Sequence, residues 1–146
     1  MAGSRGGGFC LVFGVESASS TEMSDRARVL GKQVLLVEDD PGARESIKLL
    51  LTIDRHGVTE AQNGQEAIQL FQQYVFDLVI IDFFMPQMQG KELASNLKST
   101  AASVPILMVT AYAEKLVDMD IQVDAILPKP FAVDELRQAI AKLVRV

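Results

Sequence analysis

The sequence predicts an α/β fold, in which a five-stranded parallel sheet lies between two layers of helices as a three-layer α/β/α sandwich. Short apolar runs of strand length recur along the chain, and segments with apolar residues at helical spacing separate them. The run from Leu78 to Ile81 is continuously apolar, as expected of a strand that helices cover on both faces. Pro86 lacks a backbone N–H donor, so this strand must have ended before it.

Each element follows from local signals. Asp40 is a good N-cap for the first helix, Pro41 is a good first helical residue, and Gly57 suits the exit of that helix. The pair Asn63-Gly64 predicts the turn before the second helix, and Gly90 the break before the third. The expected strands are 34–37, 58–61, 78–81 with Asp82 at its end, 105–109 and 123–127. The expected helices are 41–54, 65–74, 91–98, a short one at 113–117, and 133–144.

Helical spacing also predicts which side chains face the core. The inner side of the second helix is expected to be Ala67, Ile68, Leu70, Phe71 and Tyr74, and that of the fifth Leu136, Ile140, Leu143 and Val144. In the first helix, the residues at helical spacing are Ile47, Leu50, Leu51 and Asp54. His56, near the end of the first helix, is expected to be a solvated loop residue.

The first 32 residues differ from the rest. Residues 3–8 are rich in glycine and residues 17–24 in serine and threonine, with a five-residue apolar island at 9–13 between them. Such composition predicts a flexible N-terminal extension over residues 1–32 and a single domain over 33–146. An alternative is that the natural protein starts at Met23.

Composition excludes several function classes. The net charge of -5 argues against direct nucleic-acid binding, which needs a basic surface. No apolar run reaches the length of a membrane span. The single cysteine, Cys10, rules out a disulfide framework within the chain and fits a cytoplasmic location.

Polar side chains follow four of the expected strands: Glu38 and Asp39 the first, Asp82 the third, Thr110 the fourth and Lys129 the fifth. The carboxyl ends of parallel strands meet at one edge of a sheet, where ligand sites of such folds lie. Three carboxylates crowded there are unfavourable without a cation. Oxygen ligands suit Mg²⁺, or Mn²⁺ in its place. Taken singly, each of these residues also fits a plain cap or loop role, but all of them at successive strand ends favour a site.

The same set suits acyl-phosphate chemistry. Asp82, when ionised, is a nucleophile for a phosphoryl group, and the metal with Lys129 would neutralise the phosphoryl oxygens. Thr110 would then donate a hydrogen bond to the attached phosphate.

From about residue 33 to 146 the chain resembles the receiver domain of two-component response regulators, a flavodoxin-like, doubly wound fold. The matching motifs are Val37-Glu38-Asp39-Asp40-Pro41, Asp82-Phe83-Phe84-Met85-Pro86 with Gly90, Val109-Thr110-Ala111-Tyr112, and Lys129-Pro130-Phe131. The resemblance implies that Asp82 accepts phosphate from a histidine kinase or phosphotransfer protein. It also implies that Glu38, Asp39, Asp82 and the backbone carbonyl of Phe84 hold Mg²⁺.

The resemblance further implies that Thr110 and Lys129 couple the phosphate to a face made by the fourth helix, fifth strand and fifth helix. One helix alone follows Phe131, so we expect a signalling switch without its own output domain. It would not be an enzyme beyond phosphotransfer and autodephosphorylation. Its partners would be the phosphodonor, an unknown downstream protein and, in one reading, a second copy of itself.

Three departures from the family pattern stand out. Ile126 occupies the position where receivers usually carry Tyr or Phe. Tyr112 is a candidate to replace that ring, and the alternative is that it only covers the site. The bulky Phe84 predicts slow autodephosphorylation if it shields the phosphate from water. The stretch between Thr110 and Lys129 is short, which predicts a truncated fourth helix.

Two other functions stay open at this point. A degenerate receiver would bind partners without phosphate, which Ile126 and the short fourth helix favour. An aspartate-based phosphohydrolase ranks last, because it would need a second carboxylate where Phe84 stands.

Overall fold

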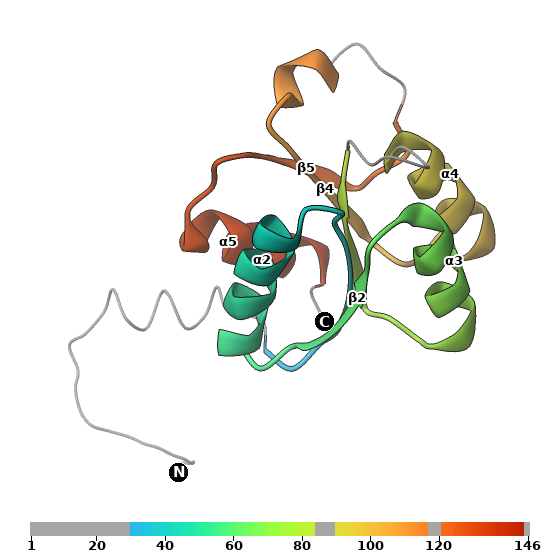
Figure 1. Cartoon of the computed structure of the whole chain (residues 1–146), viewed down its shortest axis with the longest axis horizontal. Helices are drawn as coiled ribbons and strands as arrows, with labels where there is room; N and C mark the ends of the chain where they lie inside the picture. The colour runs from blue at the N-terminus through green and yellow to red at the C-terminus, as the bar shows by residue number, and fades with distance from the viewer. Residues whose placement is uncertain (1–29, 84–89, 117–120, 145–146) are drawn as a thin grey trace, which may run out of the picture.

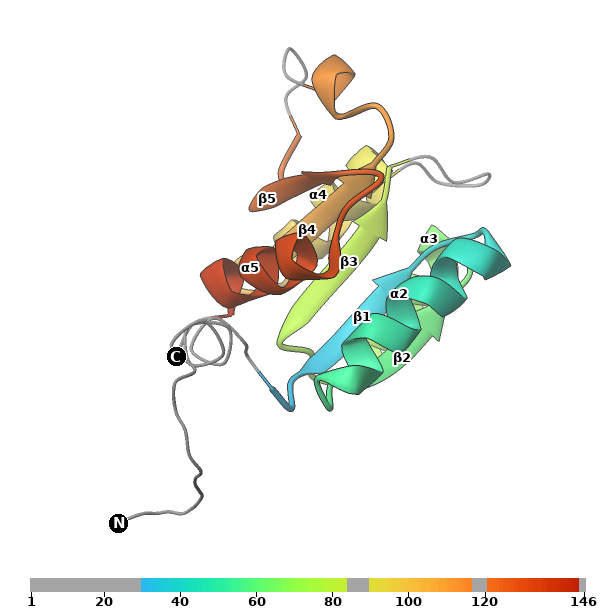
Figure 2. The same cartoon turned by 90° about the vertical axis from the view of Figure 1, so that its left-hand side faces the viewer.

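The computed structural model describes residues 30–83, 90–116 and 121–144. Their five strands form one parallel sheet in the order β2-β1-β3-β4-β5 (Figure 2). The strands are β1 (Gln33–Val37), β2 (Gly57–Ala61), β3 (Leu78–Asp82), β4 (Ile106–Thr110) and β5 (Ala125–Pro128). The helices are α2 (Pro41–Ile53), α3 (Gly64–Gln73), α4 (Gly90–Thr100), the 3₁₀ helix η2 (Ala113–Leu116) and α5 (Val133–Leu143).

Helices cover both faces of the sheet, as the continuous apolar strand predicts. Helices α2 and α5 pack on one face and α3 and α4 on the other (Figure 1). Alternate residues of β3 enter the two cores: Val79 and Ile81 face α3 and α4, whereas Leu78 and Ile80 face α2 and α5. All four of these side chains are fully buried. Burial on both faces fixes the register of β3 and thereby the place where Asp82 emerges.

The strand order creates a crevice at the carboxyl edge of the sheet. From β1 the chain crosses to β2 on one side, and then returns to β3 on the other side of β1. The connections that follow β1 and β3 therefore diverge, and open α/β sheets bind ligands in the gap between such connections. Residues 38 and 82 lie at this point.

The start of the first helix is as predicted. The Asp40 carboxylate accepts a hydrogen bond of 2.9 Å from the Ala43 N–H, and Pro41 is the first helical residue. The exit differs from the prediction. Arg55, with a φ of 63°, takes the left-handed position after the helix, and Gly57 is instead the first residue of β2. A residue other than glycine is uncommon in this conformation, so the sequence favoured Gly57, two residues later, as the end of the helix.

His56 contradicts the expectation of a solvated loop residue, because it is only 5% exposed. Its Nδ1 accepts a hydrogen bond of 3.0 Å from the Lys32 N–H, while no described residue bonds its Nε2. The chain entering β1 passes over the end of α2, where the Gly31 N–H donates to the Asp54 carbonyl. This packing of two segments that are distant in sequence buries the imidazole.

Asp54, which has the helical spacing of Ile47 and Leu51, is buried at 3% exposure. Its burial is possible because the Arg137 guanidinium on α5 contacts both carboxylate oxygens, at 2.9 and 3.1 Å.

Two other expectations differ from the structure. Tyr74 was expected to face the core but is 59% exposed, because α3 ends at Gln73 and Tyr74 has extended backbone. The fifth strand starts at Ala125 and not at residue 123, and it runs on to Pro128.

The burial of His56 predicts a pH dependence of stability. Burial lowers its pKa below 6.5, the Asp54 carboxylate opposes this, and the Lys32 charge adds to it. The unfolded chain therefore binds a proton at a higher pH than the folded one, so the contribution of His56 to stability declines as pH falls through and below 6.5. Urea unfolding at pH 7.5 and 5.5 should show a larger loss for the wild type than for His56→Gln. Equal losses in the two proteins would show that His56 has no part in the pH dependence.

Candidate functional site

Three carboxylates meet at the carboxyl edge of the sheet. Glu38 and Asp39 follow β1, and Asp82 is the last residue of β3. In the register of the sheet Val37 pairs with Ile81, which places Glu38 and Asp82 side by side. One carboxylate oxygen from each of Glu38, Asp39 and Asp82 lies within 4.8 Å of the other two. The sequence-based grouping of these residues therefore corresponds to a real cluster.

Lys129 supplies the positive charge opposite them. Its Nζ lies 3.0 Å from Glu38 Oε1 and 3.6 Å from Asp82 Oδ1. Its backbone N–H donates to the Thr110 carbonyl at 2.8 Å, which ties the loop after β5 to the end of β4. The ammonium group thus lies in the crevice, as predicted from its place after the fifth strand.

Burial and neighbouring charges shift the pKa values of two groups in the cluster, Glu38 and Lys129. Glu38 is 1% exposed, and burial raises its pKa to about 7, with the nearby Asp82 adding to the rise and the Lys129 hydrogen bond opposing it. Burial by itself would lower the pKa of Lys129, but the hydrogen bond and charge of Glu38, with the charge of Asp82, raise it overall. Lys129 therefore remains an ammonium at neutral pH, while Glu38 is only partly ionised.

This imbalance bears on whether the residues fit a metal ion. Among the described residues, one ammonium group contacts a cluster of three carboxylates. A hard divalent cation would replace the proton on Glu38 and relieve the repulsion between the carboxylates. The donor set is all oxygen, which suits Mg²⁺. The residues present fit that ion, and the fourth predicted ligand, the Phe84 carbonyl, lies outside the described residues.

Thr110 ends β4, one position past the Val109 that pairs with Asp82. Its side chain is buried at 1% exposure, and its Oγ1 accepts a hydrogen bond of 3.0 Å from the Tyr112 N–H. The hydroxyl hydrogen remains available for donation to another acceptor. The five predicted site residues that the structure describes thus lie along one edge of the sheet.

Comparisons with known proteins agree with this geometry. The family model for the response regulator receiver domain matches residues 34–141. The chain belongs to this family. The response regulator MprA of Mycolicibacterium vanbaalenii is 37% identical over 116 residues, and that of Mycobacterium leprae is 35% identical over the same length. Each match covers 77% of this chain, which spans about half the length of these relatives, 50% and 51% respectively.

Solved structures show the same fold. The response regulator TrrA of Thermotoga maritima, in complex with Mg²⁺-BeF, has 34% identity and a TM-score of 0.73 over 77% of this chain and 98% of its own. The chemotaxis protein CheY4 of Vibrio cholerae has 27% identity and a TM-score of 0.70 over 79% of this chain and 99% of its own. The flavodoxin-like fold and the receiver family predicted from sequence are therefore confirmed. None of the helices in the described ranges has the length and apolar character needed to cross a bilayer.

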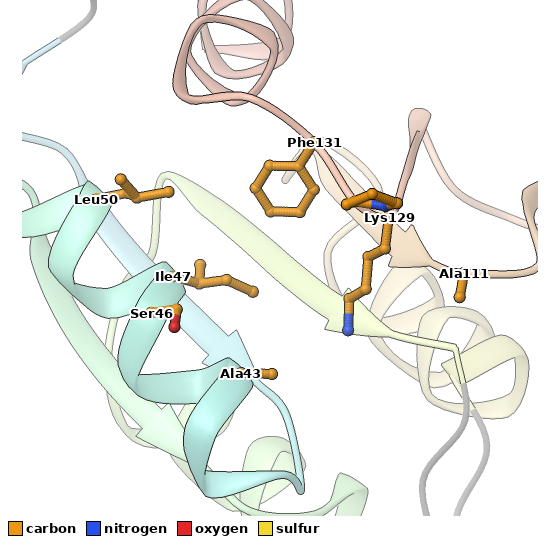
Figure 3. Close-up of a pocket in the computed structure, with 8 residues that line it drawn as sticks. Ala43, Ser46, Ile47, Leu50, Ala111, Lys129 and Phe131 are labelled. Atoms are coloured by element: carbon orange, nitrogen blue, oxygen red, sulfur yellow. The ribbon is translucent and has the colours of Figure 1, made fainter.

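The receiver has an apolar groove that shares Lys129 with the carboxylate cluster. It encloses about 410 Å³ between α2 and the two loops that follow β4 and β5. In Figure 3 the side chains of Ile47 and Leu50 face Phe131 across it, and the Lys129 side chain runs toward the end of β3. Sequence reasoning did not find this groove, because it arises between segments that are distant in the chain. The motif Lys129-Pro130-Phe131, singled out from the sequence, contributes to its lining.

The departures from the family pattern can be located. Ile126 is 38% exposed on β5, and Tyr112 is 46% exposed in the loop after β4. Within the described residues, the crossover from β4 to β5 contains the 3₁₀ helix η2 at the place predicted for the short fourth helix. The last residue of the predicted helix, Val117, lies outside them.

Gly90 has a larger role than the loop break predicted for it. Its N–H donates to the Phe83 carbonyl at 2.8 Å. A Cβ at this position would lie 2.7 Å from the Asp82 carbonyl oxygen and 2.9 Å from the Phe83 Cα. Because both contacts involve backbone atoms, only glycine allows α4 to begin this close to Asp82.

Gly90→Ala should therefore lower the free energy of unfolding by about 1–3 kcal/mol, the usual cost of forcing an extra methyl group into a packed site. Gly42→Ala is the matched control. Its Cβ would meet only the Asp40 carboxylate oxygen, at 3.6 Å, and alanine favours the helix, so stability should stay equal or rise. Urea denaturation measures both. A Gly90→Ala protein as stable as the wild type would contradict this role.

Proposed function

We propose that this receiver accepts a phosphoryl group on Asp82 in a Mg²⁺-dependent reaction and thereby switches a partner-binding surface. The observation that carries the proposal is the position of the Asp82 carboxylate, 3.6 Å from the Lys129 ammonium and within the 4.8 Å cluster with Glu38 and Asp39. Asp82 is partly accessible, with 13% of its side chain exposed, whereas the Glu38 side chain is buried, with 2% exposed. Of the two carboxylates that contact Lys129, Asp82 is thus the more open to a donor.

The donor we propose is a phosphohistidine on a histidine kinase or phosphotransfer protein. A bond forms between an Asp82 carboxylate oxygen and phosphorus as the phosphorus–nitrogen bond breaks, and the electron pair of that bond returns to the imidazole nitrogen. Lys129 stabilises the negative charge on the phosphoryl oxygens. Mg²⁺, when held by Glu38, Asp39, Asp82 and the Phe84 carbonyl, supplies further charge neutralisation, and Mn²⁺ would serve with the same ligands.

Thr110 links the phosphate to the rest of the domain. Its hydroxyl, at the end of β4, would donate to a phosphoryl oxygen. The same hydroxyl oxygen already accepts a hydrogen bond from the Tyr112 N–H, and the Thr110 carbonyl accepts one from the Lys129 N–H. Movement of this residue would change the face formed by η2, β5 and α5. The half-exposed Tyr112 is the ring we propose to respond there, since Ile126 has none.

The same proposal covers partners and location. A phosphodonor and an effector protein, or a second copy of the chain, are the interactions expected of such a switch in the cytoplasm. Its only chemistry would be transfer to and loss from its own Asp82, with no external substrate turned over. A phosphorylation-independent interaction module is the second candidate, and the missing ring at Ile126 together with the short η2 favours it.

Acetyl phosphate with Mg²⁺ tests the proposal directly. Intact-mass spectrometry should show a gain of one phosphoryl group on the wild type and none on Asp82→Asn. Lys129→Ala should slow the reaction about 10²-fold, because a charge that stabilises the developing oxyanion is lost. Asp77→Asn is the control: this carboxylate lies before the other end of β3, where it bonds the Gln33 N–H at 2.8 Å, and should react as the wild type does.

Modification of Asp82→Asn at the wild-type rate would place the phosphate elsewhere and reject the assignment. No modification of the wild type would favour the phosphorylation-independent module.

A further inference from the structure

Arg44, in the first turn of α2, contacts the backbone between the two acidic residues after β1. Its Nη1 donates to the Glu38 carbonyl oxygen at 2.8 Å. The Arg44 backbone N–H also donates to the Asp40 carbonyl, at 2.9 Å. Arg44 thus contacts the loop of residues 38–40 twice, through its side chain at Glu38 and through its main chain at Asp40.

A second carboxylate holds the guanidinium in place. Arg44 Nε lies 3.3 Å from Glu60 Oε1, and the other oxygen of Glu60 lies 2.9 Å from Lys48 Nζ. Glu60 is on β2, where it pairs in register with Leu36 of β1. The side chain of Arg44 is only 15% exposed, so its position is constrained by packing as well as by charge. Arg44 therefore connects β2 with the peptide that follows Glu38.

The orientation of that peptide matters for a metal ion. Consecutive side chains of an extended chain point in opposite directions, so Glu38 and Asp39 reach one point only if the backbone between them is turned. The carbonyl bonded by Arg44 belongs to the peptide that joins these two residues. Fixing this carbonyl fixes how the two carboxylates diverge from the chain.

We propose that Arg44, anchored by Glu60, is a positioning residue for the divalent-cation site, and this rests on the Mg²⁺-dependent function proposed above. A guanidinium close to the carboxylates also repels a cation. The two effects have opposite signs. Loss of positioning weakens Mg²⁺ binding, whereas loss of repulsion strengthens it, so substitutions can separate them.

Arg44→Lys keeps the charge but replaces the planar fork by one ammonium, which cannot reproduce both the carbonyl and the Glu60 contacts. Arg44→Ala removes contacts and charge together. Glu60→Gln leaves Arg44 in the chain but takes away its charged anchor. Lys48→Ala is the matched control, because it removes an equal charge from the same carboxylate partner without touching the Glu38 carbonyl.

Mg²⁺ titration by isothermal calorimetry, at fixed pH and ionic strength, measures the effect. Loss of a group that orients metal ligands typically weakens binding 10- to 100-fold, so Arg44→Lys should raise the Kd by about tenfold. Arg44→Ala should also bind more weakly than the wild type despite the lost repulsion, and Glu60→Gln should be intermediate. Lys48→Ala should remain within about twofold of the wild type.

A readout without metal tests the positioning itself. Hydrogen–deuterium exchange of the peptide that covers residues 37–41 should be faster in metal-free Arg44→Lys, and unchanged in Lys48→Ala. At saturating Mg²⁺ the acetyl phosphate reaction of Arg44→Lys should return to near the wild-type rate, since the reacting groups remain.

The outcomes separate this inference from the proposed function. A wild type that binds Mg²⁺ together with an unchanged Kd in Arg44→Lys, or a lower Kd in Arg44→Ala, overturns the positioning role and leaves the proposed function standing. A wild type that binds no Mg²⁺ overturns both.

Discussion

The contact of one ammonium with two carboxylates, those of Glu38 and Asp82, is the constraint around which this structure is arranged. Like charges so close together are unfavourable, and Glu38 is almost fully buried. The two carboxylates therefore repel one another, and Lys129 and the surrounding packing hold them together. An arrangement of this kind gains stability when further positive charge enters, as a divalent cation would supply.

The fold positions these groups through buried strands and through contacts to the main chain. Fully buried strands fix the register of β1 against β3, so residues 38 and 82 emerge next to one another. The Lys129 loop is tied to β4 through the Thr110 carbonyl. Gly90 lets α4 begin against the Asp82 backbone, and Arg44 holds the peptide after Glu38. Each of these contacts acts on the main chain next to a side chain of the carboxylate and lysine cluster, so the backbone sets the positions of these side chains.

Much of this was predictable from the sequence, because parallel strands bring their carboxyl ends to one edge. Glu38, Asp82 and Lys129 needed only strand assignments and charge to be grouped. Contacts between distant segments were not predictable. His56 is buried by the chain entering β1, and Arg44 reads as an ordinary helix residue until Glu60 of β2 is placed beside it. No local signal encodes either contact.

The predicted ends of two helices were wrong where local sequence rules compete with tertiary structure. Gly57 looked like the natural helix exit, but Arg55 accepts the left-handed conformation and the glycine begins β2. Tyr74 has the spacing of a core residue, yet the helix stops one residue earlier and the ring is left exposed. The response regulator motifs were more reliable, because they mark chemistry at strand ends and do not depend on where each helix ends.

The free energy of unfolding with and without Mg²⁺, at constant ionic strength, tests the central claim most directly. If the carboxylate cluster is a cation site, urea unfolding of the wild type should show stabilisation that grows with Mg²⁺, by about 2.7 kcal/mol at one hundred times the Kd. Asp39→Asn, which removes one carboxylate from the cluster, should gain distinctly less at the same concentration. A wild type whose stability does not respond to Mg²⁺ would contradict the account.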